Sequence, residues 1–355
     1  MSTVESEIKP KIGITIGDIN GVGIEIIIKT LADSRMLTVC TPIIYGSSKV
    51  ISYHRKALNN LEFNFNTIRH ADEASHKKTN LINCWEEDVK VELGKPNELG
   101  GQYALKSLQS AGKDLMEKKI DAVVTAPIDK ATIQSEGFTM KGQTEFFASL
   151  SNTAEPVMLM VSDRMRIALV SGHMALKEVA GSITKEKIIA KTKIVNETLK
   201  RDFGIRKPRI AVLALNPHAG DGGLMGKEEE ECIAPAVKEL NNAGLSVYGP
   251  YPADGFFGSS KFKGFDAIMA MYHDQGLVPF KALAFSTGVN YTAGLPIIRT
   301  SPDHGTAYDI AGKGVASEDS FREAIYLACD IAKQRMITAE ITADPLKITS
   351  RASDR

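Results

Sequence analysis

The chain has 355 residues, of which 43% are apolar and 24% are charged, as in an ordinary globular protein. Its 43 Lys and Arg side chains equal its 43 Asp and Glu side chains in number, so no overall basic excess favours binding to nucleic acid or to an anionic membrane. A chain of this length is expected to form two domains or lobes, and it contains no apolar run as long as the roughly 18 residues of a membrane-spanning helix.

Apolar strand-like segments alternate with amphipathic helical segments along most of the chain. In chain order, the predicted strands are residues 10–18, 40–46, 121–127, 156–162, 166–172, 209–215 and 265–271. The predicted helices are residues 21–33, 47–58, 102–119, 184–203, 227–244 and 321–336. Residues 60–98 are less regular, with short strand-like pieces such as 80–85. This alternation predicts an α/β fold with a mixed, mostly parallel sheet.

The four cysteines are scattered along the chain and form no C-x-x-C pair. This spacing argues against a disulfide framework and against a thiolate zinc site. The N-terminal residues MSTVESEIKPK also lack the apolar segment of a secretory signal. We therefore expect a cytoplasmic protein.

Two glycine-rich segments fail the tests for nucleotide-binding loops. TIGDINGVGIEI, residues 15–26, lacks the third glycine of G-x-G-x-x-G, and we interpret it as a tight turn, with a ligand-facing loop as the alternative. GDGGLMGKEE, residues 220–229, has Asp221 where a phosphate-binding loop needs glycine and Glu228 where it needs Ser or Thr. Its backbone amides could still bind an anion at a helix start. The acidic run 228–231 is interpreted as the first turn of that helix rather than as a metal site.

Three of the seven histidines each follow a predicted strand at the point where the strand ends: His173, His218 and His273. Because the carboxyl ends of parallel strands share one edge of a sheet, the three imidazoles could converge. Neutral imidazoles suit Zn²⁺ or another divalent ion with an open coordination position. The sequence gaps are too long for any local spacing rule, so each histidine could instead be an ordinary loop residue.

Eight segments between about residues 11 and 330 carry distinctive motifs: GITIGDINGVGIE, VVTAPIDK, KGQTEFFA, SGHMALKEV, LNPHAGDGG, GPYPADGFF, YHDQGLVPFK and GVNYTAGLPIIRTSPDHGTAYDIAGKG. Together and in this order they resemble the 4-hydroxythreonine-4-phosphate dehydrogenase family of pyridoxal phosphate (vitamin B6) biosynthesis. The resemblance implies a two-lobed isocitrate/isopropylmalate dehydrogenase-like α/β fold with a cleft between the lobes. Residues 1–135 plus 300–355 would form the first lobe, on the cofactor side. Residues 136–299 would form the second lobe, on the metal, substrate and dimer side.

The resemblance also implies an activity. Members of the family oxidise the C3 hydroxyl of 4-phosphohydroxy-L-threonine with NAD⁺ or NADP⁺, and the resulting β-keto acid loses CO₂ to give 3-amino-2-oxopropyl phosphate. They are homodimers with composite active sites. The expected partners are therefore a small phosphorylated substrate, NAD or NADP, one divalent ion per site (Zn, Mg, Mn or Co) and a second copy of the chain, with no nucleic acid and no membrane.

Carried over by motif, the resemblance makes His173, His218 and His273 metal ligands shared across the dimer. It assigns substrate contacts to Gln143, Thr144, Lys281, Asn290 and Arg299. Arg299 and Lys281 would supply cationic donors for phosphate or carboxylate, and Asn290 and Thr144 would supply neutral hydrogen bonds. His304 and Asp309 would lie near the adenosine part of the cofactor, with a helix cap as the alternative for His304. Asp254 and Asp274 would handle protons or support other groups, unless they are turn residues.

One position departs from the family pattern. The usual segment G-H-T-E is Gly142-Gln143-Thr144-Glu145 here. Gln143 can donate and accept hydrogen bonds, but it carries no charge and cannot shuttle a proton near neutral pH. The departure leaves two alternatives open: a dehydrogenase of the same family with another phosphorylated hydroxy acid as substrate, such as a phosphorylated sugar acid, and a non-catalytic relative that binds metal or phosphate.

Overall fold

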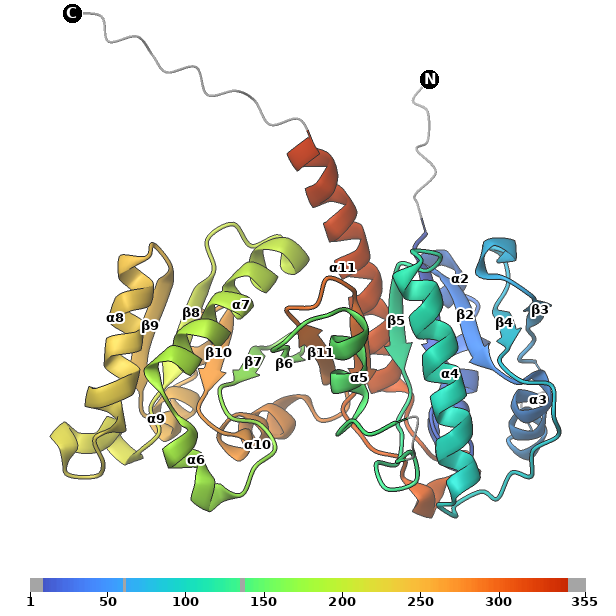
Figure 1. The fold of residues 1–355 in the computed structure, drawn as a ribbon, viewed down its shortest axis with the longest axis horizontal. Coiled ribbons are helices and arrows are strands. Elements are labelled where there is room, and N and C mark those ends of the chain that lie inside the picture. The colour runs from blue at the N-terminus through green and yellow to red at the C-terminus, as the bar shows by residue number, and fades with distance from the viewer. Residues whose placement is uncertain (1–8, 60–61, 135–137, 344–355) are drawn as a thin grey trace, which may run out of the picture.

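The computed structural model describes residues 9–59, 62–134 and 138–343. Its centre is a sheet of 12 strands in the order β3-β4-β2-β1-β5-β12-β11-β6-β7-β10-β8-β9, with helices on both faces (Figure 1). The α/β fold with a mixed, mostly parallel sheet is therefore confirmed.

Most neighbouring strands of the sheet run parallel. From one edge to the middle these are β3 (Asn66–Ile68), β4 (Asn80–Asn83), β2 (Thr41–Gly46), β1 (Lys11–Thr15), β5 (Ala122–Thr125) and β12 (Arg299–Pro302). The middle is antiparallel: β11 (Val289–Ala293) runs against β12 and β6 (Val157–Val161), and β6 runs against β7 (Arg166–Leu169). Beyond β7, the strands β10 (Ala267–Ala270), β8 (Arg209–Leu213) and β9 (Ser246–Tyr251) are parallel again.

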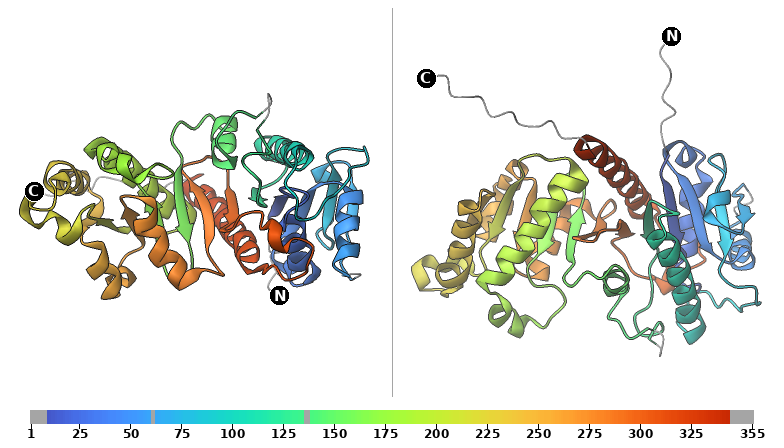
Figure 2. Two further views of the ribbon diagram at one scale, coloured as in Figure 1. Left: turned by 90° about the horizontal axis from the view of Figure 1, so that it is seen from below. Right: turned by 45° about the horizontal axis from the view of Figure 1, so that its top comes forward.

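Helices cover both faces of this sheet. One face packs against α1 (Gly23–Ala32), α3 (Ser48–Ala57), α7 (Lys185–Phe203), α8 (Ala234–Asn242) and α11 (Asp319–Ala343). The other packs against α4 (Glu98–Met116), α5 (Gln143–Leu150), α9 (Ala253–Gly258) and α10 (His273–Ala284). Two short helices, α2 (Met36–Val39) and α6 (Leu176–Ser182), each add one buried residue, Met36 and Val179, to the core of the first face. The C-terminal end of α11 extends away from the sheet (Figure 2). None of the helices in the described ranges could cross a membrane, since none is both long and apolar enough.

All the predicted strands and helices are found, with end shifts of a few residues and, for α11, an extension of seven residues beyond the predicted end. The helix predicted over 227–244 begins as a π-helical turn, Glu229–Ile233, before α8. Strands β9, β11 and β12 were not predicted, and β3 had no range of its own within the irregular stretch 60–98, because these strands are short and contain Gly, Pro, Asn or Arg rather than an apolar run. The loop expected at His273 is instead the first turn of α10.

The glycine-rich turn before α1 packs against the chain itself. A Cβ atom on Gly23 would lie 2.6 Å from the carbonyl oxygen of Ile16, and one on Gly21 would lie 2.8 Å from that of Thr306. Gly17 has a φ of +67°, in the left-handed region that favours glycine. These close approaches account for the glycines as a tight turn.

A buried ionic network joins α7, α11 and β11 on the face opposite α5 and α10. The Asp202 carboxylate, with a side-chain exposure of 0%, accepts hydrogen bonds from Arg201 Nε (2.7 Å), Arg335 Nε (2.7 Å) and the Tyr291 hydroxyl (2.5 Å). Arg335 Nη1 also donates to the carbonyl of Pro296, in the β11–β12 connection, at 2.6 Å. The network therefore fixes β11 and β12 relative to the helices behind them.

This network predicts a stability difference for Asp202→Asn. The substitution leaves two arginines without their shared carboxylate, so we expect the free energy of unfolding at pH 7 to fall by about 3 kcal/mol in urea denaturation. Burial raises the pKa of Asp202, but hydrogen bonds from Arg201 and Arg335 outweigh it and hold the pKa below its usual value. The contribution is thus complete above the unfolded-state pKa of about 3.9 and is lost as the pH falls through the folded-state pKa.

Glu117→Gln, on an exposed carboxylate at the end of α4, serves as the control and should leave the unfolding curve unchanged. A wild-type free energy of unfolding in Asp202→Asn at pH 7 would show that the network contributes no net stability.

Candidate functional site

A pocket of about 1060 Å³ lies on the face of the sheet that carries α5 and α10. Its walls come from the segment after β5, the first turn of α5, strands β6, β11 and β12, the segment after β7, and α10. Eight of the predicted site residues line it: Gln143, Thr144, His173, His273, Lys281, Asn290, Arg299 and His304. These residues are far apart in sequence, and the sheet brings them together.

Arg299, the first residue of β12, is the most buried charge in this pocket, with 4% of its surface exposed. Its Nη2 donates to Gln143 Oε1 at 2.6 Å and to Thr125 Oγ1 at 2.8 Å. Its Nη1 donates to Thr292 Oγ1 at 3.3 Å and to Thr144 Oγ1 at 3.4 Å. The guanidinium is therefore held by four side chains, all of them neutral.

No carboxylate in the described part of the chain forms an ion pair with Arg299. Burial lowers the pKa of Arg299 to about 10, an effect that Glu145 only partly offsets, so the guanidinium keeps its charge near neutral pH. Taking an unpaired charge out of water costs several kcal/mol. A buried cation surrounded by neutral donors and acceptors therefore indicates a site for an anionic ligand.

Two buried acceptors in the same pocket have no hydrogen-bond partner: Asn290 Oδ1 and His304 Nε2. The Nδ1 atom of His304 lies 3.0 Å from the carbonyl of Gly305, which can only accept, so Nδ1 carries the proton and Nε2 is an acceptor in the neutral ring. Buried polar atoms are normally paired. Both atoms are therefore suited to accept hydrogen bonds from O–H or N–H groups of a ligand. His304 caps no helix, because the helical element that follows it is a single 3₁₀ turn, Tyr308–Ile310, whose N-cap is Ala307.

Lys281, on α10, differs from Arg299 in having a carboxylate partner. Its Nζ lies 3.2 Å from Asp303 Oδ2, and the Asp303 side chain is 15% exposed. Burial raises the pKa of Asp303, and the positive charge of Lys281 partly opposes that shift. The charge of Lys281 is therefore already shared within the protein.

Sequence reasoning did not single out three further cations that line the pocket: Lys130, Lys141 and Lys191. With Lys281 and Arg299 they make five cations against two carboxylates, Glu145 and Asp303. Lys130 and Lys141 lie in the motif strings VVTAPIDK and KGQTEFFA, which could have signalled them, whereas Lys191 is an ordinary helical lysine in the sequence. The net positive charge suits a substrate with more than one anionic group.

The first turn of α5 adds to this positive character. Its cap residue, Gly142, offers no side-chain hydrogen bond, and the first helical bond runs from Phe146 N to Gly142 O at 3.1 Å. The amide groups of the first turn therefore have no partner within the helix and can donate to an anion.

His173 and His273 lie side by side at the edge of the pocket, with ring centroids 5.3 Å apart. The Nδ1 atom of His273 is 2.7 Å from Asp274 Oδ1, which leaves Nε2 available to a ligand. Partial burial, followed by the charges of Lys130 and His273, lowers the pKa of His173 and favours its neutral form. The pair thus provides two of the imidazole ligands that a divalent ion would need.

His218 does not join that pair. Within the residues that the structure describes, no three His, Cys, Asp or Glu side chains lie close enough together to hold a metal ion. His218 is exposed in the turn Pro217–Gly223, where residues 218–222 all have left-handed φ angles. Such a run is strained for the non-glycine residues and needs strong local support.

Glu229 supplies that support. This buried carboxylate accepts hydrogen bonds from the backbone amides of Leu215 and Asn216, both at 2.8 Å, and from Asn216 Nδ2 at 3.0 Å. The acidic run 228–231 therefore anchors the loop that carries His218. The amides at the base of this loop are paired with the protein's own carboxylate.

The remaining predicted residues lie outside the pocket. Asp254 is exposed in the first turn of α9, and Asp309 is exposed in the 3₁₀ turn Tyr308–Ile310. Asp274 is exposed and contacts the site only through His273. In the described part of one subunit, none of the three lines the pocket.

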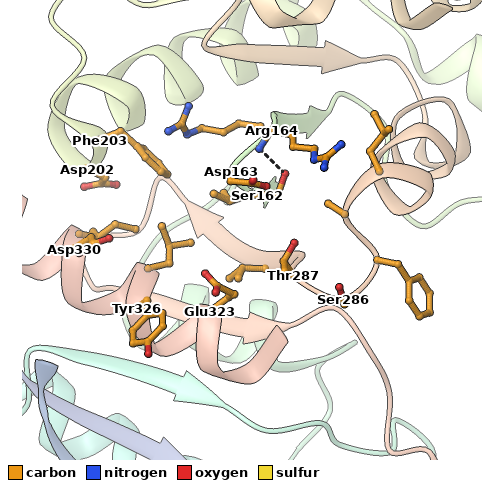
Figure 3. Close-up of a pocket in the computed structure, with 18 of the residues that line it drawn as sticks. Ser162, Asp163, Arg164, Asp202, Phe203, Ser286, Thr287, Glu323, Tyr326 and Asp330 are labelled. Carbon is orange, nitrogen blue, oxygen red and sulfur yellow. Dashed lines mark hydrogen bonds between the residues drawn. The ribbon is translucent and has the colours of Figure 1, made fainter. Parts of the chain in front are cut away.

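A second pocket, of about 870 Å³, lies between the β6–β7 turn, the end of α7, residues 282–287 and α11 (Figure 3). It contains the carboxylates of Asp163, Glu323 and Asp330, and the guanidinium of Arg166 lies 4.5 Å from the centre of the Phe203 ring. None of the predicted site residues lines it. The pocket beside α5 and α10 is therefore the candidate active site.

Comparisons with known proteins agree on one family. The family model described as "Pyridoxal phosphate biosynthetic protein PdxA" matches residues 38–328. The chain is 55% identical over 342 residues to a 4-hydroxythreonine-4-phosphate dehydrogenase of Bacteroides thetaiotaomicron, covering 96% of this chain and 94% of the relative. It is 40% identical over 328 residues to an Oceanobacillus iheyensis protein named as a candidate D-threonate 4-phosphate dehydrogenase, covering 91% and 98%. A crystal structure of 4-hydroxythreonine-4-phosphate dehydrogenase from Klebsiella pneumoniae superposes with a TM-score of 0.80 and 34% identity, over 92% of this chain and 99% of that one.

The contact between Gln143 and Arg299 predicts the effect of Gln143→Glu. The new carboxylate would sit beside the guanidinium and neutralise it, so we expect the affinity for inorganic phosphate, measured by calorimetry, to fall by roughly 10-fold or more. The melting temperature should not fall, because the substitution gives a buried cation an opposite charge. Gln109→Glu, on the exposed side of α4, should change neither value. Unaltered phosphate affinity in Gln143→Glu would mean that Arg299 does not bind the anion.

Proposed function

Because the chain belongs to the pyridoxal phosphate biosynthetic protein PdxA family, we propose that it oxidises 4-phosphohydroxy-L-threonine at C3 with NAD⁺ or NADP⁺. The nicotinamide would accept a hydride from C3 as the hydroxyl proton is released, which would give a β-keto acid. The bond to the carboxyl carbon then breaks, CO₂ leaves, and a proton replaces it to give 3-amino-2-oxopropyl phosphate. The observation that carries the proposal is the buried Arg299 guanidinium, which has no carboxylate partner among the described residues and lies in a pocket with a net positive charge.

In this proposal the pocket binds the phosphorylated end of the substrate at Arg299. Arg299 Nη1, whose hydrogen bonds to Thr144 and Thr292 are long at 3.4 and 3.3 Å, would exchange them for the phosphate oxygens. The Thr144 hydroxyl and the amides of the first turn of α5 would donate to the same oxygens. Gln143 acts indirectly: its Nε2 donates to the carbonyl of Ala126 at 2.9 Å while its Oε1 accepts from Arg299, so the side chain holds the guanidinium in place.

The unpaired acceptors suit the other polar groups. Asn290 Oδ1 would accept a hydrogen bond from the amino or hydroxyl group of the substrate, since both groups carry hydrogens. His304 Nε2 would accept one from a hydroxyl or amide group of the nicotinamide cofactor, and Asp309, five residues further along the chain, would lie near the same cofactor. Lys281 keeps its ion pair with Asp303 until a substrate anion competes for it.

The donor set also fits a divalent ion. His173 and His273 would hold it from one subunit, with Asp274 orienting the His273 ring, and His218 of a second copy would complete the set. A metal ion such as Zn, Mg, Mn or Co would supply Lewis-acid polarisation of an oxygen that it contacts. Partial burial favours the neutral form of His173, and both imidazoles line the pocket.

A homodimer is part of the proposal because His218 lies outside the pocket of its own chain. Leu224 and Met225, on the same loop, are 82% and 52% exposed, and Leu176 on α6 is 73% exposed. Apolar side chains of this size on one edge suit burial against a second copy. Asp254 would reach a site only if the partner subunit brought it there.

We also propose a division of the chain into two lobes. We place the cofactor side in residues 1–135 plus 300–355 and the metal, substrate and dimer side in residues 136–299. In support, β12 begins at Arg299 and pairs with β5, so the late segment returns to the N-terminal half of the sheet. The four free thiols suit the reducing cytoplasm, which we propose as the compartment.

A second candidate substrate should be tested for NAD⁺ or NADP⁺ reduction alongside the first. The relative from Oceanobacillus iheyensis is named for D-threonate 4-phosphate, a phosphorylated sugar acid that has a hydroxyl group where the first substrate has an amino group. Gln143, in place of the usual histidine, favours testing this alternative. Both candidates offer donors to Asn290 Oδ1, so a substrate panel is needed to distinguish them.

Metal-dependent turnover is the first test. We expect 4-phosphohydroxy-L-threonine to drive NAD⁺ or NADP⁺ reduction at 340 nm, to fail after chelation, and to recover when Zn²⁺, Mg²⁺ or Mn²⁺ is added back. Turnover of D-threonate 4-phosphate instead would assign the alternative substrate. Absence of turnover with both substrates and all three ions would contradict the proposed dehydrogenase activity.

Complementation between subunits tests the shared metal site. His218→Ala and His273→Ala should each be inactive as separate homodimers, with lower metal affinity by calorimetry. After the two are unfolded together and refolded, half of the dimers are mixed and one of their two sites has all three histidines, so we expect about one quarter of the wild-type activity. If mixed dimers form, as shown by two different affinity tags, and no activity returns, the ligands do not divide between subunits in this way.

A further inference from the structure

Lys191 is a cation of the candidate active site that none of the roles above uses. It lies on α7, whereas Arg299 and Lys281 come from β12 and α10. Its side chain lines the pocket together with Leu169, Gly172 and His173, which follow β7 or lie at its end. Lys191 therefore brings a positive charge to the pocket from the opposite face of the sheet.

The Lys191 ammonium group has few partners in the protein. Its Nζ donates to the carbonyl of Leu169 at 3.4 Å, a long hydrogen bond. Among the described residues no Asp or Glu lies within ion-pair distance of it. An ammonium group has three N–H donors, so most of its hydrogen-bonding capacity is free. Burial lowers the pKa of Lys191, as expected for a lysine that has lost water without gaining a carboxylate.

Lys191 and Arg299 stand at different strands of the sheet. The Lys191 ammonium lies at the carbonyl of Leu169, the last residue of β7, whereas Arg299 is the first residue of β12, and β6 and β11 lie between these two strands. Neighbouring strands lie about 4.8 Å apart, so three steps across the sheet separate the two positions. Two cations that stood at one anion would repel each other, so this separation indicates two positions for two anionic groups.

We propose that Lys191 binds a second oxyanion group of the substrate, separate from the group that binds at Arg299. The inference rests on the proposed function in one respect: the substrate is taken to carry both a phosphate and a carboxylate. Lys191 then sets specificity, because a compound with one anionic group leaves either Lys191 or Arg299 buried without a counter-charge. Lys191 is therefore a binding residue, because the proposed contact with the substrate exists before the reaction begins.

The test compares Lys191→Met with the wild-type holoenzyme. Methionine keeps the length and the apolar stem and removes the charge, so we expect the KM for the phosphorylated substrate to rise by roughly 10-fold or more, with kcat within about 3-fold. Lys191→Arg should restore most of the loss. Lys193→Met, on the exposed side of the same helix, should behave as the wild type. An unchanged KM in Lys191→Met, or a loss confined to kcat, would overturn the proposal.

Two simpler ligands identify which oxyanion Lys191 binds. Inorganic phosphate represents the phosphate group, and L-threonine represents the carboxylate without phosphate; both are titrated by calorimetry into wild type, Lys191→Met and Lys191→Gln. Weaker binding of only one of them in both variants assigns that group to Lys191. Unaltered binding of both ligands in both variants contradicts the proposal.

The calorimetric titrations also distinguish this inference from the proposed dehydrogenase activity. If the wild type shows no NAD(P)⁺ reduction with either phosphorylated substrate, yet Lys191→Met weakens one of the two ligands, the dehydrogenase proposal fails and the oxyanion site stands. If turnover is normal and neither KM nor ligand binding responds to Lys191→Met, the dehydrogenase proposal stands and this one fails.

Discussion

The arrangement of the candidate active site depends on one buried charge. Arg299 lies almost entirely out of water, held by three threonines and a glutamine and, within the ranges that the structure describes, by no carboxylate. Those neutral partners come from β5, α5 and β11, so the position of the guanidinium is fixed by three separate elements that meet only in the folded protein. Burying an unpaired charge costs free energy unless an anion pairs with it. The net positive charge of the pocket favours the binding of such an anion.

Strands β11 and β12 are fixed in place by contacts on the face of the sheet opposite the pocket. Side chains alternate along β11: Tyr291 faces α7 and α11, where it contacts Asp202, while Asn290 and Thr292 face the pocket. The same network contacts the backbone between β11 and β12 through Arg335. A rigid hairpin of this kind keeps donors and acceptors in position before a ligand binds, which reduces the ordering cost of binding.

The three histidines follow neighbouring strands, but they do not all lie together. β10 lies between β7 and β8, so the residues after these strands share one edge, and His173 and His273 meet there. His218 follows β8 on a strained loop that Glu229 anchors, and within the described residues it does not join the pair in its own chain. The loop is therefore rigid and exposed at once, a combination that suits contact with a second subunit.

The sequence by itself determined the alternating α/β fold, the helix and strand positions with long apolar periodicity, and the family, because these depend on local patterns and on ordered motifs. It also named eight residues that share the pocket. It did not reveal β11 and β12, whose short polar segments become strands only through pairing with β6 and β5. Only the tertiary structure decided that Lys281 has a carboxylate partner while Arg299 has none in the described part of the chain. It also decided that Lys191 reaches the pocket and that His218 stands apart. Those properties depend on distances between residues far apart in the chain, and no local spacing encodes them.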